Sequence, residues 1–419
     1  MPETKVQIPV KAWYGDTEMD LDFPDRWTVT TCRMKGHDTP EMTDQEIRDA
    51  LASPIESLPL AELARGNKDA VILFDDLTRP APTSRILPFI LEILAEAGLE
   101  DDHIRFVGAF ANHAAMSRED FAKKLGDDTM RRFRVYNHNP YENHVDLGST
   151  SRGTPIRVNR EVMACDLKIG IGGLIPHPGA GFGGGAKMVF PGVMSIDSVA
   201  HNHGEIKRPP TTGPTGMLGI VEGNVLREDI EEAVRKVNLD QKIDLLINNR
   251  RELVGVFAGD FVAQHRAGVA KARELYATPC PEGMDIVVCN TYPIESQATK
   301  GVWPARRSLR EGGTAVVITH AIEGQAVHYL TGRFGTDYGG RLWNPVKAGV
   351  AKASRVLVYS EYLSRTDLDR FGPPERVVGC ETWREVLEHL EADYPGSADV
   401  AVFPCAAIQC PDDLPETAA

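Results

Sequence analysis

Short apolar runs that alternate with longer amphipathic segments are the feature that most limits the fold of this 419-residue chain. Ala70–Phe74, Ile104–Ala109 and Asp166–Gly172 have the apolar content of buried strands. Helical patterns begin near Thr83–Ser84 and near Ser117, and we expect these hydroxyl residues to cap the helices. Strands that alternate with helices indicate an α/β protein with mostly parallel sheets.

The length of the chain predicts two domains, because a single core seldom grows this large. Pro and Gly at 278–283 interrupt a helical pattern and indicate a linker. Three further apolar runs follow it, at 285–290, 313–318 and 355–359. We therefore predict an N-terminal α/β domain at 1–275 and a smaller C-terminal α/β domain at 284–400. A tail at 401–419 is predicted to pack back on the N-terminal domain.

Charge and cysteine usage exclude several classes of partner. The net charge is −14 and Lys and Arg do not cluster, so we expect no nucleic acid partner. The seven cysteines show no C-x-x-C spacing, which favours reduced thiols over disulfides or a cysteine-based zinc site. No signal pattern and no membrane-spanning apolar run is present, which predicts a cytoplasmic protein without a membrane partner.

A glycine-rich stretch between 176 and 187 ends at Lys187 and is followed by His201 and His203. So many glycines cost backbone entropy, which is justified where the backbone must approach a ligand closely. A phosphate-binding P-loop would need Ser or Thr after the lysine, but the next residue is Met188. A dinucleotide fingerprint would need a helix here, and the prolines at 176 and 178 break it. The stretch therefore indicates a loop around another cofactor.

The candidate reactive residues each follow a predicted strand. Asp76 and Arg79 come after the first strand, His113 after the second and His177 after the third. Because ligands of open α/β sheets bind beyond the carboxyl ends of the strands, these residues could converge in one crevice. Three histidines can also hold a catalytic zinc, and His203 would complete such a set. A packed or surface role is the simpler interpretation of six other histidines: His37, His103, His138, His144, His265 and His389. His320 and His328 stay undecided.

Taken together, the order and spacing of these residues resemble the nickel-pincer lactate racemase family. The matching elements are Tyr14-Gly15, Asp76-Leu77-Thr78-Arg79-Pro80, His113, His177, Lys187, His203, and Gln297 with Lys300. The resemblance implies two α/β domains, the N-terminal one binding the cofactor, with the active site in the cleft between them.

The family's cofactor is a nickel-pincer nucleotide, a pyridinium mononucleotide whose thioamide and thiocarboxylate arms hold nickel. The resemblance implies that Lys187 carries it covalently and that His203 supplies a nickel ligand. Asp76 and Thr78 are placed beside the cofactor by the same motif. Two sulfurs, a carbon and one imidazole would form a planar site, which suits Ni(II) better than zinc. Maturation would require cofactor-synthesis proteins as partners.

The same resemblance implies that His113 and His177 are the paired acid/base residues, and that Arg79, Gln297 and Lys300 bind the substrate. Removing hydride from C2 of a 2-hydroxy acid avoids a carbanion, but it requires an acceptor that only a cofactor supplies. A neutral histidine suits the accompanying removal of the hydroxyl proton. We therefore predict a racemase or epimerase that inverts C2 of a small-molecule 2-hydroxy acid, lactate-like or larger.

Two alternatives stay open at this point. One is a zinc-dependent hydrolase or lyase that uses the same histidines, and the other is a non-enzymatic protein that binds the nickel nucleotide. Metal analysis with intact-mass measurement separates them, because zinc without an adduct on Lys187 would favour the hydrolase. The sequence also leaves open the particular substrate, the oligomeric state, a role for Trp303 or Trp343 in the site, and His201 as a substitute for His203.

Overall fold

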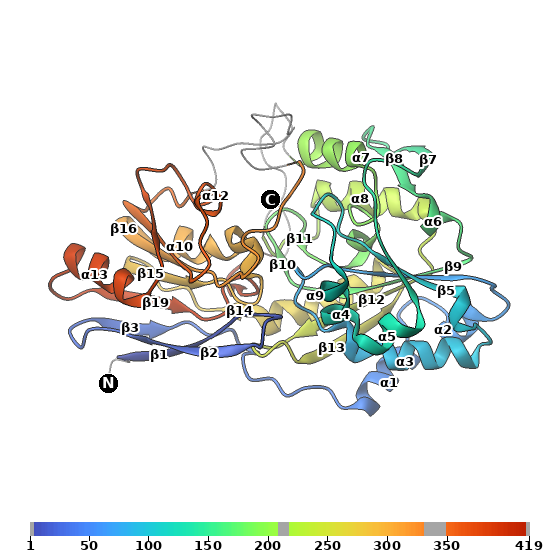
Figure 1. Cartoon of the computed structure of the whole chain (residues 1–419), viewed down its shortest axis with the longest axis horizontal. Coiled ribbons are helices and arrows are strands. Elements are labelled where there is room, and N and C mark those ends of the chain that lie inside the picture. The colour runs from blue at the N-terminus through green and yellow to red at the C-terminus, as the bar shows by residue number, and fades with distance from the viewer. Residues whose placement is uncertain (1–3, 208–217, 331–348, 416–419) are drawn as a thin grey trace. The chain divides into compact units, whose positions relative to one another are not determined.

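The computed structural model describes residues 4–207, 218–330 and 349–415, which form two compact units (Figure 1). The central unit comprises residues 38–274 and 415–419, and the terminal unit comprises residues 1–37 and 275–414. Each unit is built around a six-stranded sheet. The α/β class and the mostly parallel sheets predicted from the sequence are confirmed.

The sheet of the central unit has the strand order β13-β12-β9-β4-β5-β6. Its strands are β4 (Ala70–Phe74), β5 (Ile104–Gly108), β6 (Arg134–Asn137), β9 (Leu167–Gly173), β12 (Gln241–Ile247) and β13 (Leu253–Gly259). All neighbours pair in parallel except β12 and β13, which are antiparallel. Every residue of β4 and β9 is buried, as in a parallel sheet that is covered on both faces.

The strand order reverses between β4 and β9. From β4 the chain proceeds to β5 and β6 on one side, and it returns to β9 and β12 on the other. In a doubly wound sheet this topological switch point opens a crevice at the carboxyl ends of the two strands, where ligands bind. The loops that begin after Phe74 and Gly173 therefore flank the expected binding position.

Helices and small hairpins complete the central unit. The helices are α1 (Asp44–Ala52), α2 (Leu60–Ala64), α3 (Thr83–Glu96), η1 (Asp101–His103), α4 (Arg118–Leu125), α5 (Asp127–Arg132), α6 (Arg160–Met163), η2 (Gly185–Met188), α7 (Ile196–His201), η3 (Asn202–Ile206), α8 (Val225–Val237) and α9 (Ala263–Tyr276). Two antiparallel hairpins pair β7 (His144–Ser149) with β8 (Pro155–Asn159), and β10 (Pro176–His177) with β11 (Gly181–Phe182). Across the described ranges, no helix has the length and apolar character needed to cross a membrane.

The local predictions for the central unit hold with one exception. The three predicted strands appear as β4, β5 and β9 within a residue at their ends. Ser117 caps α4, and Asp120 closes a capping box with it. The prediction of a hydroxyl cap on α3 was wrong, because Pro82 occupies the N-cap position and makes no side-chain hydrogen bond. Thr83 is instead the first helical residue and is buried.

The sheet of the terminal unit is entirely parallel, with the order β18-β17-β16-β15-β19-β3. Its strands are β3 (Thr28–Thr31), β15 (Met284–Asn290), β16 (Leu309–Ile318), β17 (Arg355–Tyr359), β18 (Val377–Cys380) and β19 (Asp399–Phe403). Alternate residues of β15 pack into two separate hydrophobic clusters, one on each face of the sheet. The remaining elements are β1 (Lys5–Val10), β2 (Thr17–Asp22), β14 (Ala277–Thr278), η4 (Glu295–Val302), α10 (Trp303–Ser308), α12 (Arg365–Leu368), α13 (Trp383–Asp393) and β20 (Cys410–Pro411).

The two units differ from the domains predicted from the sequence at both ends of the chain. Residues 1–37 were expected in the N-terminal domain, but β3 pairs with β19 and so extends the sheet of the terminal unit. The predicted tail also begins inside β19, and its β20 pairs with β14. Sheet pairing between distant segments is what groups these residues, and local sequence patterns do not reveal such pairing.

Candidate active site

Three of the predicted site residues lie in loops at the carboxyl ends of neighbouring strands in the central unit. Asp76 follows β4, His113 follows β5, and His177 lies in the β10–β11 hairpin that follows β9 (Figure 1). These strands include the pair β4 and β9 at the switch point. The topology therefore brings to one edge of the sheet residues that are separated by up to a hundred positions in sequence.

Asp76 and His113 form a direct pair. The distance from Nδ1 of His113 to Oδ2 of Asp76 is 2.6 Å, and both side chains are largely buried. Burial by itself would raise the pKa of Asp76, but His113, Arg79 and Thr78 together hold it below the usual value. Because an ionised carboxylate only accepts hydrogen bonds, we assign the hydrogen to Nδ1 of His113. Nε2 is then the nitrogen that can accept a proton.

Thr78 links this pair to Arg79. The Thr78 hydroxyl donates to Oδ1 of Asp76 at 2.5 Å, and it accepts a hydrogen bond from Nη1 of Arg79 at 2.8 Å. Lys124 stabilises the loop after β4. Its ammonium donates to the carbonyls of Arg79 and Ala81 and forms a buried ion pair with Asp75. Lys124 was not predicted, because in the sequence it is one of several charged residues on an amphipathic helix.

His177 is held in the opposite way to His113. Its Nδ1 accepts hydrogen bonds from the backbone N–H groups of Gly179 and Ala180, both at 3.1 Å. Since this nitrogen accepts hydrogen bonds, the hydrogen of the neutral ring lies on Nε2. Both histidines therefore present Nε2, but in different protonation states: an acceptor on His113 and a donor on His177.

Lys187 lies in the turn η2, is partly buried and has cationic neighbours. Burial lowers the pKa of its ammonium well below the ordinary value, and Arg227, Arg79 and Lys207 lower it further. All three of these neighbours carry positive charge. Burial and these neighbours therefore favour the neutral form of the Lys187 amine, which has a lone pair for bond formation.

Two glycines before Lys187 cannot be replaced without displacing the surrounding groups. Gly184 and Gly185 have φ values of +70° and +57°. A Cβ atom on Gly184 would lie 2.6 Å from a carboxylate oxygen of Asp244, and one on Gly185 would lie 2.8 Å from the ring of His265. The backbone of this stretch approaches other groups closely, as predicted. At Gly184 and Gly185 these groups are side chains of the protein itself.

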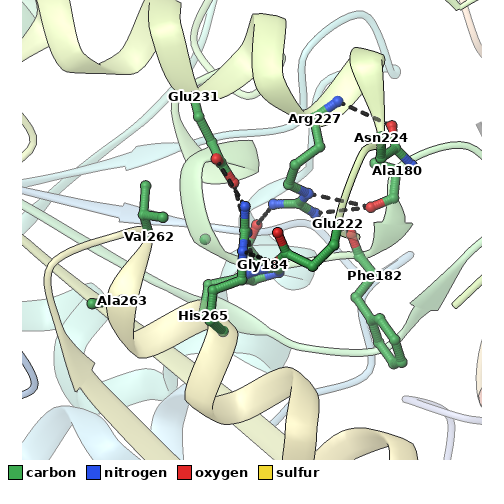
Figure 2. A network of polar contacts seen from close by, with 12 residues as sticks. Ala180, Phe182, Gly184, Glu222, Asn224, Arg227, Glu231, Val262, Ala263 and His265 are labelled. Carbon is green, nitrogen blue, oxygen red and sulfur yellow. Dashed lines mark hydrogen bonds and ion pairs between the residues drawn. The ribbon is translucent and has the colours of Figure 1, made fainter. Parts of the chain in front are cut away.

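A set of buried polar side chains, drawn in Figure 2, forms hydrogen bonds to the glycine-rich loop before Lys187. The guanidinium of Arg227 donates to the carbonyl oxygens of Ala180, Phe182 and Gly184. Nε2 of His265 bonds to the carbonyl of Gly183 at 2.8 Å, so His265 has a supporting role that its sequence context did not indicate. Sequence patterning missed Arg227 because α8 is amphipathic and charged throughout, and only the fold shows which charge is buried.

Asp244 completes the support of the loop. Both of its oxygens accept the backbone N–H of Gly185, at 3.1 and 2.9 Å, and it forms a buried ion pair with Lys242 at 2.6 Å. A carboxylate at the start of η2 fixes the turn that presents Lys187. This residue was also absent from the sequence predictions.

His203 lies in the π-helical turn η3, directly after α7. Helix α8 packs against η3 and also against η2, so one helix supports the segments that carry His203 and Lys187. His201 is the last residue of α7, and its Nδ1 lies 3.0 Å from the hydroxyl of Thr154. π-turns of this kind are frequent at functional positions.

Gln297 and Lys300 belong to the terminal unit. Both lie in η4, which follows β15, and Gln297 has non-helical φ and ψ within it. The carboxylate of Glu295, in the same segment, is buried and accepts the backbone N–H groups of Lys11 and Ala12 at 3.0 and 2.7 Å. The segment that carries the two predicted substrate residues is therefore anchored to the turn after β1.

The two tryptophans left open by the sequence have different outcomes. Trp303 donates from its indole to the carbonyl of Ala406 at 2.8 Å and packs edge-on against Phe403, which is a core position. Trp343 lies outside the described residues. Within the described ranges, no three or more His, Cys, Asp or Glu side chains gather as a metal centre.

Comparison with known proteins points in one direction. The profile of the lactate racemase N-terminal domain matches residues 14–213. A lactate racemase from Lactiplantibacillus plantarum is 31% identical over 293 residues, which cover 68% of this chain and 68% of that protein. The chain belongs to the lactate racemase family. A second lactate racemase, from Thermoanaerobacterium thermosaccharolyticum, is 28% identical over 330 residues and covers 76% of this chain and 75% of its own length.

Solved structures agree on the fold of this family member. The lactate racemase apoprotein from Thermoanaerobacterium thermosaccharolyticum matches with a TM-score of 0.76 at 20% identity, over 97% of this chain and 99% of that chain. A protein from Thermotoga maritima matches with a TM-score of 0.65 at 17% identity, over 87% of this chain and 97% of that chain. The resemblance identified from the sequence is thereby confirmed at the level of family and fold.

Proposed function

We propose that this family member is a racemase or epimerase that inverts C2 of a 2-hydroxy acid, lactate-like or larger, with a nickel-pincer nucleotide attached to Lys187. The observation that carries the proposal is the position of Lys187 after the glycine turn, where burial and then Arg227, Arg79 and Lys207 lower the pKa of its ammonium and favour the neutral amine. A neutral amine has the lone pair needed to form a thioamide, whereas an ammonium has none. The same cations favour an anionic nucleotide.

Other features of the central unit fit the cofactor. The glycine turn before Lys187 places backbone where side chains would obstruct a ligand. Thr83, the first residue of α3, has a buried hydroxyl with no hydrogen-bond partner among the described residues, and the positive end of the helix dipole at this position favours a phosphate. In our proposal His203 binds the nickel, and Asp76 and Thr78 lie beside the cofactor. When bound, this group supplies the acceptor that takes hydrogen with its electron pair from C2 and returns it.

We assign the proton chemistry to the two histidines. Nε2 of His113 accepts the proton of the C2 hydroxyl, and the carboxylate of Asp76 stabilises the imidazolium that forms, through the 2.6 Å contact at Nδ1. Nε2–H of His177 donates to the oxygen at C2. For His177 to release a proton and remain neutral, its Nδ1 must first gain one, which the N–H groups of Gly179 and Ala180 oppose. We therefore expect the turn at 178–180 to move when His177 is protonated.

Substrate binding is assigned to three further residues. The planar guanidinium of Arg79 can grip a carboxylate through two hydrogen bonds, and its neighbour Thr78 orients it. We propose that Gln297 and Lys300 bind the carboxylate and hydroxyl region of the substrate. The substrate class follows from the activity of the relatives, which are lactate racemases, and from the cationic side chains of Arg79 and Lys300.

The test uses cofactor-loaded protein, a panel of 2-hydroxy acids and chiral chromatography, with intact mass reporting the adduct on Lys187. We expect His113→Ala to lower turnover by about 10²–10⁴-fold, the usual contribution of a general base, with the adduct retained. His177→Ala is expected to impair turnover in the same way. His103→Ala is the matched control, because His103 also pairs with an aspartate, Asp69, but at an exposed position on η1.

Two results would contradict the proposal. Full activity of the His113 variant would show that His113 is not the general base. Loaded wild-type protein that carries the adduct and inverts no member of the panel would instead support a non-enzymatic nickel-nucleotide protein. Protein expressed without the cofactor-synthesis proteins is not a valid sample for either measurement, since it would lack the adduct.

A further inference from the structure

A second buried network surrounds Asp229 and includes the contact between Thr154 and His201. Asp229 lies on α8 and is completely buried. Its Oδ1 accepts the hydroxyl of Thr150 at 2.6 Å, while its Oδ2 accepts the hydroxyl of Thr154 at 2.8 Å and the amide of Asn202 at 2.7 Å. Three neutral donors from two other segments thus satisfy one buried carboxylate. Among the described residues no cation pairs with the Asp229 carboxylate. Burying a carboxylate without a cation is costly, so we expect Asp229 to have a role at this position.

The three segments that meet here are α8, the turn of the β7–β8 hairpin, and the junction of α7 with η3. Contacts between α7 and β8, and of α8 with both η3 and β7, bring them together. Helices α7 and α8 and strands β7 and β8 are labelled in Figure 1. The hairpin turn is itself well defined, because the N–H of Thr154 also bonds to the hydroxyl of Thr150 at 3.1 Å. A rigid turn on one side and a helix on the other hold the junction between them.

Counting hydrogens assigns the tautomer of His201. The Thr154 hydroxyl has one hydrogen, and it is used in the bond to Asp229. The contact of 3.0 Å between Thr154 Oγ1 and His201 Nδ1 must then be donated by His201, so Nδ1 carries the hydrogen. His201 therefore donates a hydrogen bond to the β7–β8 hairpin through Nδ1.

Both the side chain and the backbone of Asn202 form hydrogen bonds. Its amide nitrogen bonds to Asp229, and its buried Oδ1 has no hydrogen-bond partner within the described ranges. Its backbone carbonyl accepts the N–H of Lys207, which is the five-residue spacing of a π-turn. The side chain that precedes His203 is therefore held by Asp229 at the residue where the α-helix changes into the π-turn.

We propose that Asp229 is a positioning residue, which acts through Asn202 and through Thr154 and His201 to fix the π-turn that presents His203 to the nickel. This inference rests on the proposed function, since it assigns a task to the support of a nickel ligand. Residues that orient metal ligands from behind typically change metal affinity by about 10–100-fold when they are removed. The network is the counterpart, for His203, of the support that Arg227 and Asp244 give to Lys187.

The experiment measures nickel loss from cofactor-loaded protein to a chelator, with intact mass for the adduct on Lys187. Asp229→Asn and Asn202→Leu are expected to lose nickel about 10–100-fold faster than the wild type while the adduct remains. Thr154→Val is expected to show part of this effect, and Thr154→Ser, which keeps the hydroxyl, is expected to restore the wild-type rate. A merely structural role of Thr154 would not give this rescue in the metal release rate.

Glu232→Gln is the matched control, because Glu232 lies on the same helix and bonds to Ser151 of the same hairpin, but not to Asn202 or His201. Its nickel release should equal that of the wild type. Should Asp229→Asn fail to fold, the Asn202 and Thr154 variants decide the question.

Wild-type nickel release from folded Asp229→Asn and Asn202→Leu proteins would overturn the inference and leave the proposed function standing. A wild-type protein that carries the adduct but binds no nickel would overturn both. Faster release from the Glu232 control, equal to that of the Asp229 variant, would also count against the assignment, since general loosening of α8 would then explain the effect.

Discussion

Arg227 offers the sharpest test of how the loop before Lys187 is supported. Its guanidinium is buried and donates to three backbone carbonyls, those of Ala180, Phe182 and Gly184 (Figure 2). In Arg227→Met a side chain of comparable length stays in place, but every one of these donors is lost. The carbonyls then remain buried without those donors.

The magnitude follows from these contacts. The carbonyls of Ala180 and Gly184 also accept the backbone N–H groups of Phe182 and Lys187, so they keep a donor in the variant. The Phe182 carbonyl loses its donor at a cost of about 1–3 kcal/mol, and the two other lost hydrogen bonds cost about 0.5–1.5 kcal/mol each, which gives roughly 2–6 kcal/mol. Removing a buried cation returns part of this, because burial of the guanidinium is itself unfavourable, as its lowered pKa of about 10 indicates. Measured costs of breaking buried charge networks are about 3–5 kcal/mol, and we expect a loss of unfolding free energy in that range.

The assay is urea unfolding of the apoprotein at pH 7, followed by circular dichroism. Arg235→Met is the control, because Arg235 lies on the exposed side of the same helix and should change the free energy by no more than about 0.5 kcal/mol. The same variant tests the electrostatics of Lys187. Without the charge of Arg227 the pKa of Lys187 rises toward its ordinary value, so labelling by an amine reagent shifts to higher pH.

Two outcomes would refute the reasoning on Arg227. An unfolding free energy within about 1 kcal/mol of the wild type would mean that the carbonyls find other donors at little cost. An unchanged pH profile for Lys187 labelling would mean that burial alone, the larger of the two causes, keeps the amine neutral.

Two further predictions concern single positions in each unit. Gly184→Ala should destabilise the apoprotein by at least about 1–3 kcal/mol, because φ is +70° and the new Cβ would contact Asp244. Gly66→Ala is the control, since Gly66 also has positive φ but has open space around it. The difference between the two variants in a thermal melt measures the effect of the clash. Burial raises the pKa of Glu295 to about 7, so its contribution to stability is present below pH 4.5 and is lost as pH rises through 7. Glu295→Gln should therefore flatten the fall in melting temperature between pH 5 and 8, and an unchanged slope would contradict that reasoning.

Local sequence patterns predicted the elements of the central sheet correctly. The apolar runs at 70–74, 104–109 and 166–172 became β4, β5 and β9, since strands buried on both faces must be apolar throughout. The reactive residues then followed from position, because the carboxyl ends of parallel strands share one edge. The family resemblance rested on the same residues and is confirmed by the comparisons.

Other features depend on contacts between distant segments and had no local signal. The pairing of β3 with β19 moved residues 1–37 into the terminal unit. The burial of Arg227 and Asp244 distinguishes them from charged residues that look alike in sequence. The cap of α3 was predicted wrongly because a preceding proline took the position of the hydroxyl.

The chain alone determined the residue types and their order: a lysine after glycines, histidines after strands, and an aspartate and an arginine in one loop. Tertiary structure decided their states. His113 carries its hydrogen on Nδ1 because Asp76 lies against it, and His177 carries its hydrogen on Nε2 because two N–H groups face Nδ1. The pKa of Lys187 is lowered by burial and then by the cations around it. Protonation depends on the neighbours of a group in space, and only the fold brings those neighbours together.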